Sequence, residues 1–242
     1  MFATFIFNPL YNAVIFLLGN FSFLDAGMVI VIFTLFVKVV LFPLSKKSAR
    51  TQILMKMVEP ELNAIKEKYK GNKEEQARQT MALYKEKKIN PFAGIVVLFI
   101  QIPILWALYR IFYTHGLTDI NTSILYPFVH APEMVKTAFL GLVDITSKNI
   151  PLAVITAITQ YIQSVVVMPK TQNKEKIGTS VMGDMNTMLQ FQMKYFFPLM
   201  MLFIAYTGTA TVAIYLTTSN LFMIAQEYVV RRHLEKEGLK KA

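Results

Sequence analysis

The sequence contains no cysteine among its 242 residues. This absence excludes a disulfide framework, a thiolate metal site, a cysteine nucleophile and a lipid-modified N-terminal cysteine. Charged residues are also scarce, at 17% of the chain, whereas soluble domains contain about 25%. Hydrophobic residues make up 54% and the mean hydropathy is +0.43. These values exclude a disordered chain and indicate an integral membrane protein.

Patterns of catalysis and metal binding are missing as well. The three histidines, His115, His130 and His233, have no ligand spacing, and there is no glycine-rich phosphate loop. Lys38 and Ser45 would lie about 10.5 Å apart along a helix, too far for the nucleophile and base of a hydrolase. The apolar segments hold no carboxylate well inside, which a proton-coupled transporter usually keeps. We therefore expect no enzyme activity, no cofactor and no metal.

Five apolar segments predict an all-α polytopic membrane protein. A transmembrane helix needs roughly 20 mainly apolar residues, and helices are the only option because barrel strands would be shorter and alternating. The predicted spans are 27–44, 91–113, 151–168, 195–206 and 209–230, and the fourth extends upstream to about residue 188.

The positive charges predict the orientation of these spans. Lys and Arg number 12 in residues 45–90, 4 in 169–194 and 5 in the basic tail 231–242, against 2 in 114–150. Since cytoplasmic connections carry the excess of Lys and Arg, the first three lie in the cytoplasm and 114–150 is an outer loop. This places the N-terminus outside and the C-terminus in the cytoplasm. It also accounts for most of the net charge of +10.

Residues 1–26 lack the positive region of a signal peptide. We interpret them as an interfacial amphipathic helix on the outer surface, and the residues expected to face lipid are Leu10, Val14, Leu17 and Leu18. A sixth span with the N-terminus inside is the alternative.

The cytoplasmic insert 45–90 predicts an antiparallel helical hairpin. Helical spacing joins Leu54, Val58, Leu62, Ile65 and Tyr69, and the period continues through Ala77, Met81, Tyr84 and Lys88. Between the two stripes, Gly71 suits a helix C-terminus, and Asn72 with Glu75 forms a capping box for the next helix. Pro60 should bend or restart the first helix, and the second should end at Ile89. Because such a hairpin has little core, it should move relative to the bundle.

Lys38 is the most informative polar residue. It lies six residues from the cytoplasmic end of its span, with Thr34 one turn away on the same face. A lysine at a helix centre costs about 2.5–3.5 kcal/mol on insertion, although snorkelling to the interface is an alternative explanation. Other polar groups at membrane depth are Gln101, Thr156, Thr159, Gln160, Gln163, Thr217, Thr218, Ser219 and Asn220. Each alone suits interhelical hydrogen bonding, but with a cation and no acid they favour a hydrated cavity open to the cytoplasm.

Four motifs resemble one family over nearly the whole chain. They are the stretch 34–44 around Lys38 and Pro43, the stretch 81–91 ending in Asn90-Pro91, the stretch 101–109, and Tyr215 followed by Ser219-Asn220. In order and spacing these resemble the YidC/Oxa family of membrane protein insertases. The resemblance implies a five-helix core, a cytoplasmic hairpin and a groove open to cytoplasm and lipid.

The resemblance also suggests the residues of the site. It makes Lys38 the groove cation with Thr34 beside it, and the further candidates for the substrate groove are Gln101, Gln160, Gln163, Tyr215 and Asn220. Two residues depart from the family pattern, because its cation is often Arg, and Leu216 stands where a second aromatic is common. The resemblance is to the minimal core type of the family, for which no large extracytoplasmic domain is expected before the first span.

The function expected is an insertase of a bacterial plasma membrane that guides hydrophobic segments of nascent membrane proteins into the bilayer. The expected partners are these nascent proteins and membrane lipid, with the ribosome, the signal recognition particle pathway and a Sec channel as further candidates and no specific nucleic acid. Two alternatives are a small-molecule or ion transporter, and an assembly chaperone without insertase activity.

Overall fold

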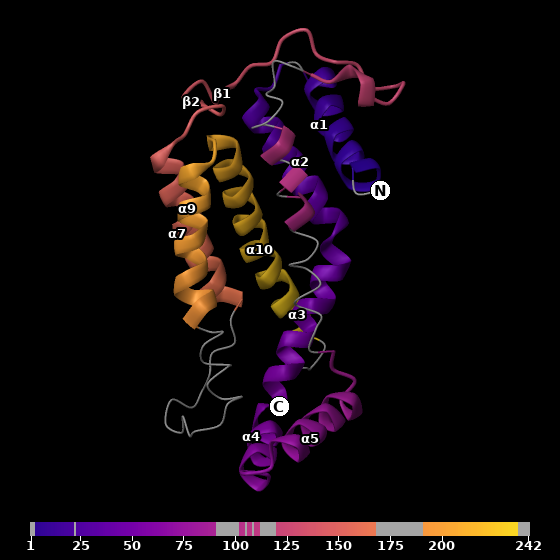
Figure 1. The fold of residues 1–242 in the computed structure, drawn as a ribbon, viewed down its shortest axis with the longest axis vertical. Helices are drawn as coiled ribbons and strands as arrows, with labels where there is room; N and C mark the ends of the chain where they lie inside the picture. Colours follow the sequence, from indigo (N-terminus) through magenta and orange to yellow (C-terminus); the bar gives the residue numbers. More distant parts are fainter. Residues whose placement is uncertain are drawn as a thin grey trace.

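The structure, a computed structural model, describes residues 3–21, 23–90, 102–104, 106–107, 109–111, 120–167 and 191–236. Long helices form an elongated bundle with a helical pair at one end and a loop across the other (Figure 1). The pair is α4 (Glu59–Lys68) and α5 (Lys73–Glu86), and we call this the hairpin end. The loop comprises residues 120–149, and we call this the loop end.

The first long helix of the bundle is broken but continues toward the hairpin end. Helix α2 (Ala26–Val40) stops at Leu41, and α3 (Phe42–Met57) continues at an angle of 59°. Pro43 has no N–H to donate to the carbonyl of Val39, so the regular helix is interrupted here. The predicted boundary between the span and the cytoplasmic insert therefore falls inside α3, which carries the helix into the insert.

The other long helices are α7 (Ile150–Val167), α9 (Phe197–Thr207), which follows the π-helix η4 (Gln192–Phe196), and α10 (Ala210–Lys236). Helix α10 is central, because it packs against both α2 and α7, while α9 packs against α7. Within the described ranges, α7 alone is long and apolar enough to cross a membrane, and α2 with α3 qualifies as a bent pair. The predicted span 91–113 is described only at 102–104, 106–107 and 109–111.

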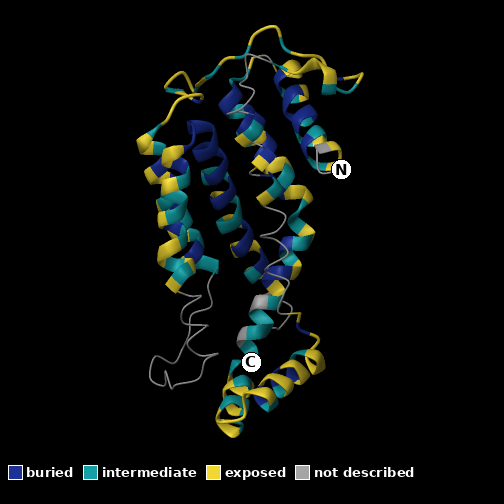
Figure 2. Cartoon of the chain, viewed as in Figure 1, coloured by how far each residue is buried: buried dark blue, intermediate teal, exposed yellow. Residues whose placement is uncertain are grey.

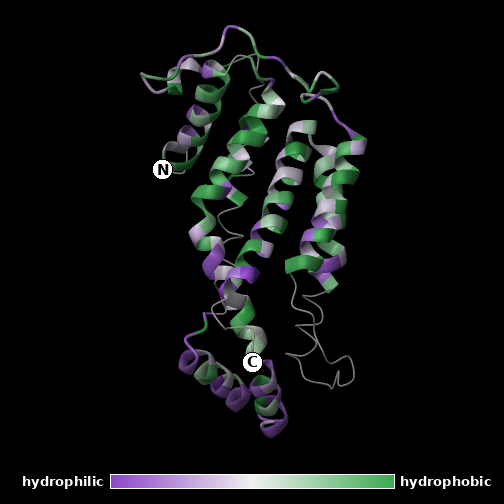
Figure 3. Cartoon of the chain, turned by 180° about the vertical axis from the view of Figure 1, so that it is seen from behind, coloured by the Kyte–Doolittle hydropathy of each residue, from purple (hydrophilic) through white to green (hydrophobic). Residues whose placement is uncertain are grey.

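The bundle exposes large apolar side chains as well as burying them (Figures 2 and 3). Phe36, Leu199 and Phe203 are each more than 60% exposed, and apolar residues of α7 such as Ile158 are about half exposed. So many exposed large apolar side chains on the helices of one bundle are typical of contact with a membrane or a partner. The hairpin end is instead hydrophilic on its surface.

The N-terminal helix packs into the bundle, which corrects the lipid-facing interpretation. Helix α1 (Asn8–Asn20) follows the π-helix η1 (Ala3–Phe7). Val14 and Leu18 are buried in the main hydrophobic core, and Leu10 and Leu17 pack against it. The expectation that Val14 and Leu18 face lipid was therefore wrong, while Leu10 and Leu17 are partly buried.

The physical reason is that α1 turns its polar side chains inward as well. The Nδ2 of Asn12 donates to the carbonyl of Ile124 at 2.9 Å, and its Oδ1 accepts from the N–H of Tyr126 at 2.6 Å. The hydroxyl of Tyr11 accepts from the N–H of Asn121 at 2.8 Å. The loop end thus supplies the partners that let these two residues be buried.

The hairpin end has the local features expected of two antiparallel helices. Gly71 has φ +106°, and the side chain of Asn72 accepts from the N–H of Glu75 at 3.0 Å. Ion pairing between Lys87 and Glu61 at 3.0 Å raises the pKa of Lys87, because it stabilises the charged amine. The second helix ends at Glu86 rather than Ile89, since Lys88 adopts φ +55° and the N–H of Ile89 bonds to the carbonyl of Tyr84.

The loop end holds a 3₁₀ turn η3 (Thr122–Ile124) and a small antiparallel hairpin of β1 (Ala138–Phe139) and β2 (Val143–Asp144). Backbone carbonyls of the loop end cap the first turns of α10 and α2. Ser147 accepts from the N–H of Ala210 at 2.7 Å, and Lys136 accepts from the N–H of Ala26 at 2.9 Å. First-turn N–H groups of α10 and α2, which have no partner inside a helix, are thereby satisfied.

Candidate functional site

The interior face of α2 carries Thr34 and Lys38, the predicted groove cation and its neighbour. Ile30, Thr34 and Lys38 follow one another at intervals of four residues, so they lie on one face of the helix. Thr34 is fully buried and Lys38 is only 7% exposed. The hydroxyl of Thr34 donates to the carbonyl of Ile30 at 2.6 Å. Lys38 is therefore held inside the protein rather than at its lipid-facing surface.

Polar side chains join α7 to α10. The hydroxyls of Thr156 and Thr217 are 2.9 Å apart, and Thr156 also reaches the carbonyl of Ala213 at 3.2 Å. The Nδ2 of Asn220 lies 3.3 Å from the hydroxyl of Thr159. Asn220 thus makes an interhelical contact and is 6% exposed. Hydrogen bonds of this kind stabilise helix pairs where no water competes.

The remaining site candidates lie in different environments. Gln160 and Gln163 are half-buried on α7, and the amide of Gln160 donates to Gln163 at 2.7 Å. Tyr215 is 1% exposed and belongs to the apolar core on α10. Gln101 lies outside the described residues. The structure thus groups Asn220 with α7 and pairs the two glutamines with each other.

The interior changes from apolar to polar along the bundle. Helices α2, α7 and α10 all begin at the loop end (Figure 1). Most of their first buried positions there are small or apolar, namely Val29 and Ile30, Ala153, and Val212 to Leu216; the buried hydroxyl of Thr211 is the exception, and it donates to the carbonyl of Ile145. From about two turns after the start of each helix, the buried residues include Thr34 and Lys38, Thr156 and Thr159, and Ser219 and Asn220. Buried polarity is therefore concentrated in the half nearer the hairpin end.

One further charged contact was missed by the sequence analysis. Glu227 on α10 is 5% exposed, and its Oε1 accepts from the Nε of Arg231 at 2.7 Å. Arg231 also donates to the carbonyl of Val166, in the last turn of α7. Through these two contacts Arg231 links α10 to α7 near the hairpin end. The spacing of Glu and Arg four residues apart on a helix was the available signal.

The described residues hold no group of three or more His, Cys, Asp or Glu side chains that could bind a metal ion. The site is thus a polar, cation-bearing interior between helices, and the polar groups in it suit water and peptide contacts.

Comparisons with known proteins identify the family. A family model described as 60Kd inner membrane protein matches residues 17–237 of the chain. The chain belongs to the YidC/Oxa family of membrane protein insertases. The resemblance seen in the sequence motifs is thereby confirmed. The match also indicates a protein of a bacterial inner membrane, and the family is not one of conventional enzymes.

Three curated relatives carry the name membrane protein insertase YidC. The one from Clostridium tetani is 31% identical over 222 residues, covering 92% of this chain and 87% of the relative. The one from Fusobacterium nucleatum is 29% identical over 236 residues, with 95% and 98% covered. The one from Leptospira interrogans is 31% identical over 237 residues, and the match covers 97% of this chain but 36% of that longer protein.

Proposed function

We propose that this protein inserts hydrophobic segments of nascent membrane proteins into the bilayer from the cytoplasmic side. The names of its relatives support this function. The observation that carries the proposal is the buried position of Lys38 in the polar half of the bundle interior. A cation and hydroxyl groups in that half would stabilise water or a polar peptide segment at membrane depth.

We further propose five membrane spans, with the loop end outside and the hairpin end in the cytoplasm. Support comes from the 21 Lys and Arg residues of the three connections assigned to the cytoplasm against 2 in the outer loop. The polar half of the interior would then lie on the cytoplasmic side. A segment entering from the cytoplasm would meet hydroxyls and Lys38 before it met the apolar core.

In this mechanism the groove shortens the apolar barrier, and Lys38 attracts a carboxylate in the polar tail that the substrate must move outward. Two unit charges about 4 Å apart interact by about 4 kcal/mol at an effective dielectric constant of about 20, and water in the groove lowers that value. The apolar part of the substrate then leaves sideways into lipid. There each Leu, Ile, Phe or Val contributes about −0.3 to −0.6 kcal/mol. Nothing is hydrolysed in these steps.

The test uses purified protein in vesicles and a single-span substrate whose outer tail is either acidic or neutral. Lys38→Arg should keep insertion of both substrates, because it keeps the positive charge. Lys38→Ala should lower insertion of the acidic-tailed substrate roughly tenfold and that of the neutral one much less. Lys47→Ala, which removes an exposed lysine of α3, is the matched control. Full insertion of the acidic-tailed substrate by a normally folded Lys38→Ala protein would refute the electrostatic step.

The same vesicles separate the proposal from an assembly chaperone without insertase activity. An insertase alone should insert a single-span substrate, whereas a holding chaperone should only keep the substrate soluble. Family membership does not favour the transporter alternative. The ribosome, the signal recognition particle pathway and a Sec channel are proposed partners of the basic hairpin and tail.

A further inference from the structure

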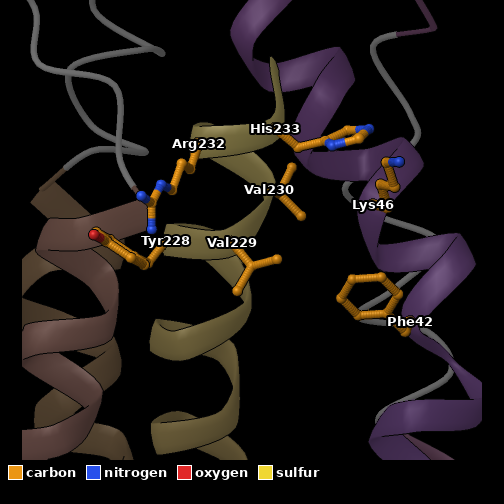
Figure 4. Close-up of a pocket in the computed structure, with 7 residues that line it drawn as sticks. All are labelled: Phe42, Lys46, Tyr228, Val229, Val230, Arg232 and His233. Carbon is orange, nitrogen blue, oxygen red and sulfur yellow. The ribbon is translucent and has the colours of Figure 1, made fainter. Parts of the chain in front are cut away.

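A cavity of about 560 Å³ lies between α3 and the last turns of α10, at the hairpin end of the bundle (Figure 4). We call it the hairpin-end cavity. Seven side chains line it, namely Phe42, Lys46, Tyr228, Val229, Val230, Arg232 and His233. None of the seven is acidic, and Lys38 and the α7 candidates are not among them. The cavity is therefore separate from the groove residues described above.

The two walls of the cavity share one order of residues. On α3, Phe42 is followed four residues later by Lys46, and on α10, Tyr228 and Val229 are followed by Arg232 and His233. Four residues are one helical turn, or about 6 Å of rise. Both helices run toward the hairpin end at this point. Each wall therefore presents an apolar or aromatic turn on the bundle side and a basic turn about 6 Å nearer the hairpin end.

The apolar turn of α10 is exposed although it lies beside cations. Tyr228 is 66% exposed and Val229 is 55% exposed, whereas Val230 is buried against α3. Figure 4 shows Lys46 and Phe42 on α3 with His233 pointing toward them, Arg232 and Tyr228 on the opposite side of α10, and Val229 between the two groups. A ligand here would meet positive charge on two sides of an apolar floor.

The charge of the surroundings favours an anion. Residues 42–50 contain Lys46, Lys47 and Arg50 but no Asp or Glu. The neighbouring carboxylate of Glu227 is buried and bound by Arg231. That carboxylate therefore does not offset the positive charge at the cavity.

We propose that the hairpin-end cavity binds one anionic phospholipid of the leaflet next to the hairpin end. Lys46 and Arg232 attract the phosphate of its headgroup from opposite sides of the cavity, and its acyl chains lie over Phe42 and Val229. Basic pockets between helices on the cytoplasmic side of a membrane recognise such headgroups. A soluble phosphate would use only the basic turn and leave the exposed apolar turn uncovered. A phospholipid matches both turns in the right order, with its head toward the hairpin end.

The experiment uses the fact that the chain has a single tryptophan, Trp106. In a Trp106→Phe background, Tyr228→Trp places a fluorophore in the cavity. Brominated phosphatidylglycerol should quench it more strongly than brominated phosphatidylcholine at equal mole fraction. Adding Lys46→Gln and Arg232→Gln should lower the preference by up to about 25-fold, since each basic side chain near a bilayer surface gives a preference of about fivefold.

The matched control removes two basic residues of the same α3 surface that do not line the cavity. Lys47→Gln with Arg50→Gln changes the net charge equally and should lower the preference in the cavity clearly less than the cavity pair does, because neither residue lines the cavity. Equal quenching by the two lipids, or an equal loss in this control, would overturn the proposal. Displacement of the lipid by millimolar inorganic phosphate would instead indicate a site for a soluble anion and would also overturn it.

A second measurement avoids the tryptophan substitutions. Native mass spectrometry of the unmodified protein should retain one phosphatidylglycerol, and the Lys46→Gln, Arg232→Gln protein should lose it. Retention by that variant contradicts the assignment. Neither measurement includes an insertion step, so a failure here leaves the proposed role of Lys38 untouched.

Discussion

The two ends of this protein are held together by different kinds of contact. At the loop end, residues distant in sequence exchange backbone hydrogen bonds that are short and partly buried. Ile145 is fully buried, and its carbonyl accepts from both the N–H and the hydroxyl of Thr211, at 3.2 and 2.9 Å. The N–H of Leu140 donates to Asp25, whose other oxygen caps α2. Such contacts tie the loop to three helices at once.

At the hairpin end, contacts are local and exposed. The pair of Lys87 and Glu61 is between one third and one half exposed, and exposed ion pairs contribute about 0–1 kcal/mol. The buried apolar set there is small, with Val58, Leu83 and Ile89 as its centre. Elements with so few buried contacts open at lower free energy than the core of a protein.

This difference parallels the gradient of polarity in the interior. The loop end, with its long-range hydrogen bonds, lies next to the mainly apolar half of the bundle. The hairpin end, with its few buried contacts, lies next to the half that contains Thr34 and Lys38. An insertase that receives its substrate from one side needs this asymmetry. One end must stay sealed while the other admits a chain.

The largest expected effect is all-or-none and tests which end lies in the cytoplasm. The chain has no cysteine, so single cysteines can be introduced at Lys73 on the hairpin end and Lys136 on the loop end, both exposed. In intact cells an impermeant maleimide should label the cysteine at 136 and not the one at 73. In inside-out vesicles the pattern should reverse. Labelling of residue 73 from outside would refute the proposed orientation and the cytoplasmic entry of substrate.

The next largest effect tests the closure of the loop end. Asn12→Ala removes the side chain that satisfies both the carbonyl of Ile124 and the N–H of Tyr126. Since a buried polar group without a partner costs about 1–3 kcal/mol, we expect a loss of about 2–4 kcal/mol. At about 2–4 °C per kcal/mol for a chain of this size, the thermal midpoint in detergent should fall by several degrees.

The control for this experiment lies on the same helix. Asn20 is exposed, and its amide donates to the carbonyl of Phe16 within α1. Asn20→Ala should therefore change stability by no more than about 0.5 kcal/mol. Equal midpoints for the two variants would mean that the loop end is not the firmly held one.

These residues also show how much the sequence could predict. The break in the hairpin was readable because its signals are local, with Gly71 at the turn and Asn72 capping the N–H three residues later. The inward packing of α1 was not readable. The partners of Tyr11 and Asn12 lie 110 to 114 residues away, and no periodicity within α1 encodes a contact at that separation.

The candidate site likewise has one part that could be predicted from the sequence and one part that could not. The burial of Thr34 and Lys38 follows from their place on one face of an apolar helix. The contact of Asn220 with Thr159 depends on how α7 and α10 are rotated against each other. Ala153 of α7 and Ala213 of α10 are buried together where the two helices meet, and a single sequence does not specify how such helices are rotated.

A smaller effect is expected at the contact between α2 and the loop end. A Cβ added at Gly27 would lie 2.4 Å from Cδ2 and 2.8 Å from Cβ of Phe139. Gly27→Ala must therefore displace β1, at a cost of about 1–3 kcal/mol for overpacking. In a Phe139→Ala background the same substitution should cost less, because most of the ring is gone. A double-mutant cycle of thermal midpoints measures this coupling, and additive effects would contradict a direct contact.

The smallest effect is expected at the hairpin end, and it should stay there. Asn72→Ala removes the cap of α5, whose Oδ1 accepts from the N–H of Glu75 at 3.0 Å. Loss of such a cap costs about 1 kcal/mol. Amide hydrogen exchange in the first turn of α5 should accelerate about fivefold, because local opening becomes easier by that amount. Asn72→Ser, which keeps a capping oxygen, should retain slow exchange.

The thermal midpoint of the bundle should not move in either variant, since no described residue of α4 or α5 belongs to its main core. A midpoint lowered as far as in Asn12→Ala would mean that the hairpin and the bundle unfold as one unit, and the contrast between the two ends would then disappear.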